Sequence, residues 1–97
     1  MSPRKAFRRA ASVVARDCGV PLQALLVPRG GRRQVQRARQ VALYLAVVSL
    51  DVCRSQAAHA VGISHQYGMR AVAKIEDLRE EPKFDRWIAS LEERLIA

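Results

Sequence analysis

The chain has 97 residues, and its 17 Lys and Arg residues outnumber its nine Asp and Glu residues to give a formal net charge of +8. This length fits a single domain, and an apolar share of 49% suffices for a compact helical core. Cys18 and Cys53 stand alone without metal-ligand spacing, so we expect small packing residues and neither a zinc site nor a disulfide.

Charge is distributed unevenly along the chain. Residues 1–40 hold ten basic residues and one acidic residue, a net charge of +9, whereas the remainder holds seven basic and eight acidic residues, a net charge of −1. Most of the basic residues are arginine, whose planar guanidinium suits phosphates and guanine edges. This pattern favours nucleic acid as the partner; the alternative is a solvated face that keeps a small protein soluble.

The longest apolar stretch, "VALYLAVVSL", covers only about half of the ~20 residues that a membrane-spanning helix requires. The basic N-terminal segment lacks the continuous hydrophobic core and cleavage site of a signal peptide. We therefore expect no membrane partner and no export, and a cytoplasmic, nucleoid-associated location.

Two helices and a loop are predicted in the first third of the chain. A helix over residues 3–18 begins with Pro3 in its first turn and stops at Gly19. Pro21 can open a short helical turn, and the segment "VPRGGRR" predicts a flexible basic loop because its proline and glycines disfavour helix. The first helix places five small or apolar residues on one face: Phe7, Ala10, Ala11, Val14 and Cys18.

The third predicted helix covers residues 34–48 and is expected to be the central scaffold. Its apolar residues recur at helical spacing, and its first turns carry basic groups toward the preceding loop. The apolar stripe consists of Val35, Ala38, Ala42, Leu45 and Val48, widened by Val41 and Leu43.

The segment "RSQAAHAVGISHQYGMRAVAKI" has the proportions of a helix-turn-helix. Ser55 is a suitable N-cap, Gly62 can form the tight turn, and Ile63 can fill the corner between the two helices. Gly68 lies early in the second helix, where a glycine lowers the stability of the helix by about 1 kcal/mol relative to alanine. The second helix should end near Glu81, because Pro82 disfavours helix at the residue before it.

A final helix is predicted over residues 82–96. The spacing of the apolar residues predicts which face of this helix, and of the helix before it, is buried. The acidic run "EDLREE" is expected to be solvated. A lone tryptophan at core spacing is expected to be a core residue and not a base-stacking one. The expected buried residues are Val72, Ile75, Leu78, Phe84, Trp87 or Ile88, Leu91 and Leu95.

With the basic loop, "ARQVALYL" and "AVAKIEDLREE" in this order, residues 7–95 resemble the C-terminal DNA-binding domain of the chromosomal replication initiator DnaA. The resemblance implies an all-α bundle of about six helices containing a helix-turn-helix, a DnaA C-terminal domain-like or Trp-repressor-like fold. It further implies a double-stranded DNA-binding protein that regulates replication initiation or transcription. The chain lacks the GxxxxGK[ST] phosphate loop of the initiator's ATPase module, so a stand-alone relative of the DNA-binding domain is expected.

The resemblance also implies roles for single residues. Arg39 matches the family's minor-groove arginine, and His65 matches a histidine that contacts bases in the major groove. At the three neighbouring base-contact positions the family has an acid and two threonines, where this chain has Ser64, Gln66 and Tyr67. Gln66 can pair with adenine in a bidentate manner.

The first functional hypothesis is therefore a sequence-preferring duplex binder. Most of its affinity would come from phosphate neutralisation, and its specificity from the start of the recognition helix. The candidate DNA-binding residues are Arg32, Arg33, Arg37, Arg39, Ser55, Ser64, His65, Gln66, Tyr67, Arg70 and Lys74.

The second hypothesis is a protein–protein adaptor of the replication initiation machinery with little specific DNA binding. Met69 at an exposed helical position motivates it, since methionines suit adaptable interfaces. An enzyme is disfavoured because His59 and His65 lack a common helical face and an orienting carboxylate or cysteine. No catalytic residue, cofactor, metal or small-molecule substrate is predicted.

Overall fold

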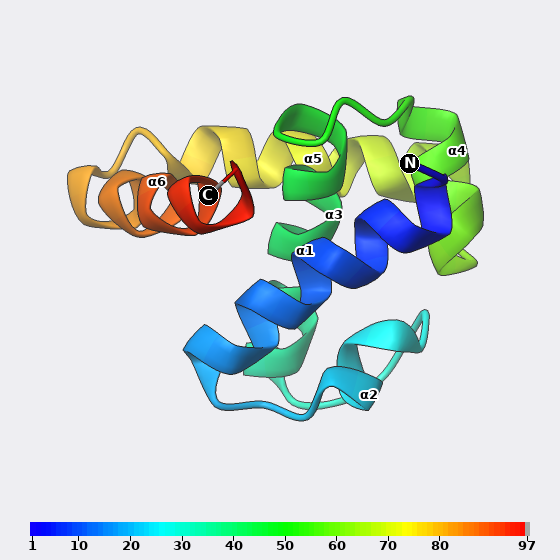
Figure 1. Cartoon of the computed structure of the whole chain (residues 1–97), viewed down its shortest axis with the longest axis horizontal. Helices are drawn as coiled ribbons and strands as arrows, with labels where there is room; N and C mark the ends of the chain where they lie inside the picture. The colour runs from blue at the N-terminus through cyan, green and yellow to red at the C-terminus, as the bar shows by residue number, and fades with distance from the viewer. Residues whose placement is uncertain (97) are drawn as a thin grey trace.

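Six α-helices follow one another along residues 1–96, the part of the chain that this computed structural model describes, and no strand occurs among them (Figure 1). The all-α class and the number of helices agree with the sequence prediction. The helices are α1 (Pro3–Cys18), α2 (Leu22–Leu26), α3 (Arg33–Val48), α4 (Arg54–Val61), α5 (His65–Leu78) and α6 (Pro82–Ile96).

Both ends of α1 are capped, and the position of Pro3 and the stop at Gly19 agree with the sequence prediction. The Ser2 hydroxyl accepts a hydrogen bond from the Lys5 amide at 3.2 Å, and Pro3 occupies the first turn. At the other end Gly19 adopts a left-handed conformation, with φ of 70°, which glycine reaches without steric cost. These caps explain why the predicted helix boundaries are confirmed.

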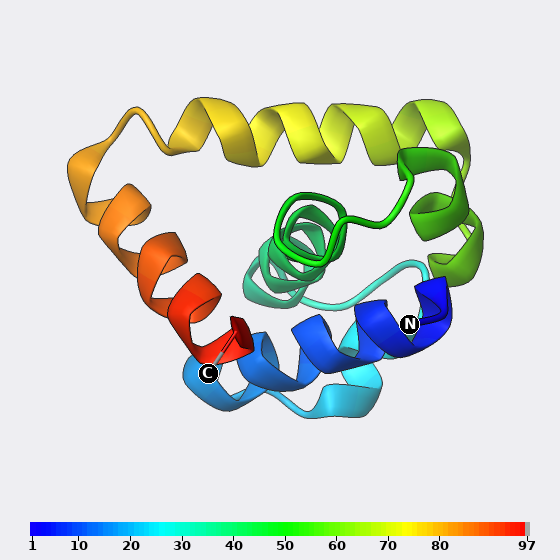
Figure 2. The ribbon, with the colours of Figure 1, turned by 45° about the horizontal axis from the view of Figure 1, so that its top comes forward.

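Helix α3 is the centre of the bundle. Figure 2 shows it almost end-on, with α1, α4, α5 and α6 arranged around it. Residues 41–46 are all buried, because a helix enclosed on every side has no solvated face in its middle. Val48, predicted to lie inward, is 44% exposed; it is the last residue of α3. The predicted central scaffold is otherwise confirmed.

Helices α4 and α5 are joined by the three-residue turn 62–64. Gly62 has a φ of 89°, and its amide donates to the Ala58 carbonyl at 3.0 Å, which closes α4. The prediction that Ser55 is the N-cap of α4 is wrong: Cys53 holds that position and Ser55 lies in the first turn. Cys53 is exposed, so it is not the packing residue that was expected, whereas Cys18 is half-buried against the core.

Helix α5 ends at Leu78, three residues before the predicted end at Glu81. Glu81 instead serves the next helix, because its carboxylate accepts the amides of Lys83 at 3.1 Å and Phe84 at 2.8 Å. Pro82 is the first residue of α6, where its fixed φ and missing amide hydrogen are tolerated. The chain therefore turns before the proline and not at it.

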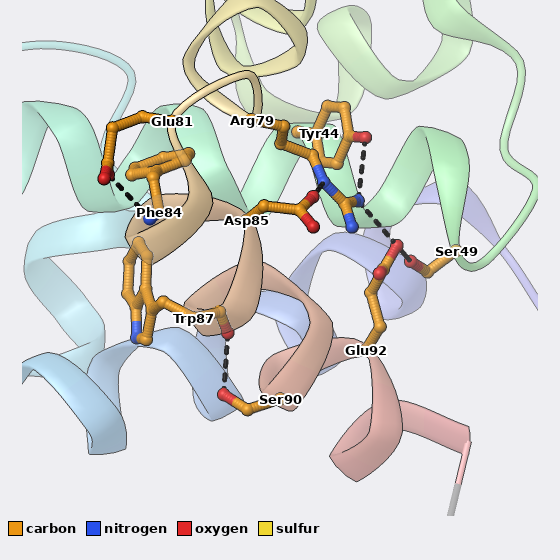
Figure 3. Close-up of polar contacts among 9 residues, drawn as sticks. All are labelled: Tyr44, Ser49, Arg79, Glu81, Phe84, Asp85, Trp87, Ser90 and Glu92. Atoms are coloured by element: carbon orange, nitrogen blue, oxygen red, sulfur yellow. Dashed lines mark hydrogen bonds and ion pairs between the residues drawn. The ribbon is translucent and has the colours of Figure 1, made fainter.

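Polar clusters attach α6 to the rest of the bundle, and Figure 3 shows the larger one around Arg79. Its Nε donates to Asp85 at 2.6 Å, and its Nη1 donates to the Tyr44 hydroxyl and to Glu92, both at 3.2 Å. Burial acts to lower the pKa of Arg79, but these hydrogen bonds outweigh it and the pKa is raised. The guanidinium thus joins the end of α5 to α3 and α6.

A second cluster joins α1 to α6. Asp17 accepts hydrogen bonds from the Trp87 indole at 2.6 Å and from Arg94. The Trp87 ring meets Phe84 edge-on, with centroids 5.5 Å apart, and both side chains are half-buried. The expectation that α6 buries an apolar face is confirmed for three residues: Ile88, Leu91 and Leu95.

No helix within residues 1–96 combines the length and the apolar character needed to cross a bilayer. Over the same residues, no three His, Cys, Asp or Glu side chains gather in an arrangement that could hold a metal ion.

Candidate nucleic-acid interface

A cleft of about 320 Å³ opens between the basic loop, α3 and the start of α5. Segments far apart in the sequence meet here, since α3 follows the loop while α5 begins some thirty residues later. The mixture of guanidinium, hydroxyl and amide groups with apolar walls suits a ligand that carries an anionic group. Its lining consists of Pro28, Arg29, Gly30, Gln36, Arg39, Ile63, Ser64 and Tyr67.

Arg39 is the most deeply placed charge of this cleft, with only 8% of its surface exposed. Its Nη2 donates to the carbonyl oxygens of Ala24 at 2.7 Å and Gly30 at 3.1 Å. Its Nε is buried and has no hydrogen-bond partner within the described part of the chain. Burial lowers the pKa of the guanidinium, and Tyr67 opposes that shift. The two carbonyl bonds hold α2 and the loop against α3.

The first turn of α5 forms the opposite wall. Ser64 is the N-cap, and its hydroxyl oxygen accepts the Tyr67 amide at 3.1 Å. This leaves the hydroxyl hydrogen of Ser64 able to donate, because a serine oxygen accepts and donates at once. The Tyr67 side chain is 48% exposed. Both predicted residues thus lie at the cleft together with Arg39.

Beyond the first turn, α5 presents an exposed face whose charge changes along its length. Gln66, Arg70 and Lys74 are exposed, and they recur at four-residue spacing on one side of the helix. The acidic residues Glu76 and Asp77 follow in the last turns and are also exposed, as the sequence predicts. The basic half of α5 therefore adjoins the cleft, and the acidic half lies farther along the helix.

His65 and Ser55 do not line this cleft. They line a separate hollow of about 480 Å³, together with Cys53, Arg54 and the segment after α3. There the Cys53 sulfur lies 3.3 Å from the Ser55 hydroxyl. This hydrogen bond, followed by the backbone amides of Gln56 and Ser55, lowers the pKa of the Cys53 thiol. Of the predicted site residues, three thus line the cleft and two line this separate hollow.

The remaining predicted phosphate contacts lie at the start of α3. Arg32 is its N-cap residue and Arg33 its first helical residue, and both are exposed, whereas Arg37 is half-buried. None of the three lines the cleft. They extend the basic surface from the loop along the first turns of α3.

Two polar side chains of the cleft, Gln36 and Arg29, were not predicted from the sequence. Gln36 lies three positions before Arg39, on the same side of α3, so helical spacing was a signal that could have identified it. Arg29 belongs to the basic loop, but no sequence pattern specifies which loop arginine turns toward α5. Only the folded path of the loop selects it.

Comparison with protein-family models and with curated proteins produced no match to this chain.

Proposed function

We infer that this protein binds double-stranded DNA through the cleft and the adjoining face of α5, and that α4 and α5 act as a helix-turn-helix like that of the DnaA C-terminal domain. The observation that supports this best is the convergence of the basic loop and the first turn of α5 on one cleft. Helix N-termini favour phosphate groups, and exposed side chains of a helix can reach base edges in the major groove. Regulation of replication initiation or of transcription is the role that fits such binding.

Each group of residues has a separate part in this proposal. Arg32, Arg33 and Arg37 contact phosphates and supply most of the affinity, because such contacts release counterions. The major groove is contacted by Gln66, Arg70 and Lys74, which share one face of α5. His65, at the start of the helix, contacts it as well. In the free protein Arg39 is bonded to one carbonyl of α2, that of Ala24, and to one carbonyl of the loop, that of Gly30, so any contact with the minor groove requires those bonds to be exchanged.

The test is fluorescence anisotropy with a duplex that carries a DnaA box and with a scrambled duplex, each at two salt concentrations. Gln66→Ala and Arg70→Ala remove exposed side chains and should leave the fold intact, while Arg39→Ala tests the buried position. Arg86→Ala on α6 is the matched control for Arg70→Ala, because it removes an exposed arginine distant from the cleft.

We expect salt-sensitive binding that prefers one duplex, and a loss of roughly fivefold to 100-fold in Gln66→Ala or Arg70→Ala, as for the removal of a base contact. Arg86→Ala should bind as the unmodified chain does. Absence of binding at low salt would overturn the proposal.

A second candidate function is that of an adaptor in the replication initiation machinery. It is favoured by two large side chains on the first two turns of α5, Tyr67 and Met69, which are 48% and 45% exposed. Such residues are common at protein interfaces. Capture of an initiation protein that persists in Arg39→Ala but is lost in Met69→Lys supports the adaptor over the DNA binder.

A further inference from the structure

The cleft contains an uncompensated positive charge. None of the described residues that line it is acidic, and two of them are arginines, Arg29 and Arg39. Arg39 is more than nine-tenths buried and its Nε has no partner among residues 1–96. A buried charge without a counter-charge is costly. An anion that enters the cleft would supply the missing negative charge.

The donors of the cleft match a phosphate group. Guanidinium groups bind phosphate through charge-assisted hydrogen bonds, and the hydroxyls of Ser64 and Tyr67 are further donors. Ser64 and Tyr67 lie at the N-terminus of α5, where the helix dipole also favours negative charge. Two guanidinium groups are balanced best by the two charges that a phosphate monoester carries near neutral pH.

The shape of the cleft distinguishes between two sources of phosphate. A phosphate within a DNA strand carries two sugar esters, whereas a terminal phosphate carries a single ester and can enter a recess end-on. Arg39 is recessed, with 8% of its surface exposed. The volume of about 320 Å³ lies near the lower limit for small-molecule sites, roughly 300–1,000 Å³. Pro28, Ile63 and the Tyr67 ring supply apolar walls for a small organic group.

We propose that this cleft binds a small phosphate monoester, with its terminal phosphate on Arg39 and Arg29 and its organic group against Pro28, Ile63 and Tyr67. This binding does not require the chain to bind DNA. Its consequence does rest on the proposed function: because Ser64 and Tyr67 also belong to the DNA-binding face, an occupied cleft competes with duplex DNA.

The test is an NMR titration of the ¹⁵N-labelled chain with phenyl phosphate, and with methyl phenyl phosphate as the matched diester. We expect saturable shifts of the Gly30, Ser64 and Tyr67 amide signals with the monoester, and binding of the diester that is weaker by about tenfold or more, since it carries one charge fewer. Equal binding of both esters overturns the assignment to a terminal phosphate. Absence of saturable shifts at the cleft with phenyl phosphate overturns the site.

Ser64→Asp is the decisive variant because aspartate retains the N-cap while it places a negative charge in the cleft. It should weaken phenyl phosphate binding by at least about tenfold. Ser2→Asp is the control, because Ser2 caps α1 through the same type of hydrogen bond and lies outside the cleft. This variant should bind phenyl phosphate as tightly as the unmodified chain does. If Ser64→Asp binds phenyl phosphate as tightly as the unmodified chain does, the proposal is overturned.

The same proteins measured with duplex DNA separate the two conclusions. A chain that binds phenyl phosphate but no duplex refutes the proposed function and leaves the site established. A chain that binds duplex but gives no saturable shifts with phenyl phosphate refutes the site alone.

Discussion

Gly68 shows how a single residue determines the way two helices pack. A methyl group at this position would lie 3.0 Å from the Ala58 side chain, closer than ordinary van der Waals contact. From the sequence alone, the glycine was only a source of lost helix stability. In the structure it is buried between α4 and α5 and permits their close approach, which places the first turn of α5 beside the basic loop.

We predict that Gly68→Val destabilises the protein by about 1–3 kcal/mol, because the larger side chain overpacks the contact with Ala58. The measurement is urea-induced unfolding followed by circular dichroism. Ala73→Val on the exposed side of α5 is the control, since it tests valine in the same helix at a cost of only a few tenths of a kcal/mol. Equal unfolding free energies for the two variants would show that the contact is not close-packed.

At the scale of elements, α6 is fastened at both ends by polar groups as well as by its apolar face. Arg79 joins Asp85 and Glu92 of α6 to the end of α5 and, through the Tyr44 hydroxyl, to α3. Asp17 joins α6 to α1 through Trp87 and Arg94. The pKa of Asp17 is lowered, and the largest cause is the hydrogen bond from the Trp87 indole. Burial acts in the opposite direction, and Arg94 lowers the pKa further. The attachment of α6 to α1 is therefore sensitive to acid.

Because the pKa of Asp17 is lower in the folded chain than in the unfolded chain, its carboxylate contributes stability above the unfolded value of about 3.9. That contribution is lost as the pH falls through the lower folded pKa. We predict that Asp17→Asn is less stable than the unmodified chain by a constant amount near neutral pH, and that the difference disappears in acid.

Urea unfolding of both proteins from about pH 3 to about pH 7 measures this difference. Glu93→Gln, which removes an exposed acid from α6, controls for the loss of one negative charge. Curves for Asp17→Asn and the unmodified chain that run parallel through the acid range would contradict the assigned role of Asp17.

At the scale of the whole molecule, the basic residues of positions 1–40 are spread over α1, the loop and the start of α3. The basic residues of the loop and the start of α3 adjoin the cleft, whereas other basic residues lie on α1, and α6 carries charges of both signs. Arg9 of α1 donates to the Leu95 carbonyl at the end of α6, where a cation complements the helix dipole. Some of the basic charge therefore stabilises the fold.

We predict that Arg32→Gln combined with Arg33→Gln lowers the slope of log affinity against log salt by up to about 1.8, since each phosphate contact contributes about 0.9 for duplex DNA. Arg16→Gln combined with Arg86→Gln is the control, because it removes the same charge from exposed positions outside the cleft. Anisotropy titrations over a range of salt give the slope. An equal decrease in both double variants would indicate a general effect of net charge.

Local chemistry allowed much of the fold to be predicted from the sequence. Pro3 and Gly19 bound α1, Gly62 closes α4, and Pro82 begins α6, since each of these residues restricts or frees the backbone at its own position. Apolar spacing likewise identified the buried centre of α3. The predicted end of α5 is wrong by three residues, because Glu81 caps the following helix. Which helix Glu81 serves depends on these hydrogen bonds and not on helix propensity.

The sequence by itself determined that this protein is helical, that its basic charge lies in residues 1–40, and which residues begin the helix after the turn, because these properties belong to neighbouring residues. Only the tertiary structure decided that Arg39 is buried against carbonyls of α2 and the loop, that Arg29 and Tyr67 share a cleft with it, and that His65 lies in a different hollow. Those relations join residues of different elements, from nine positions apart upward, so they depend on how the helices pack around α3, and no local pattern in the chain records that packing.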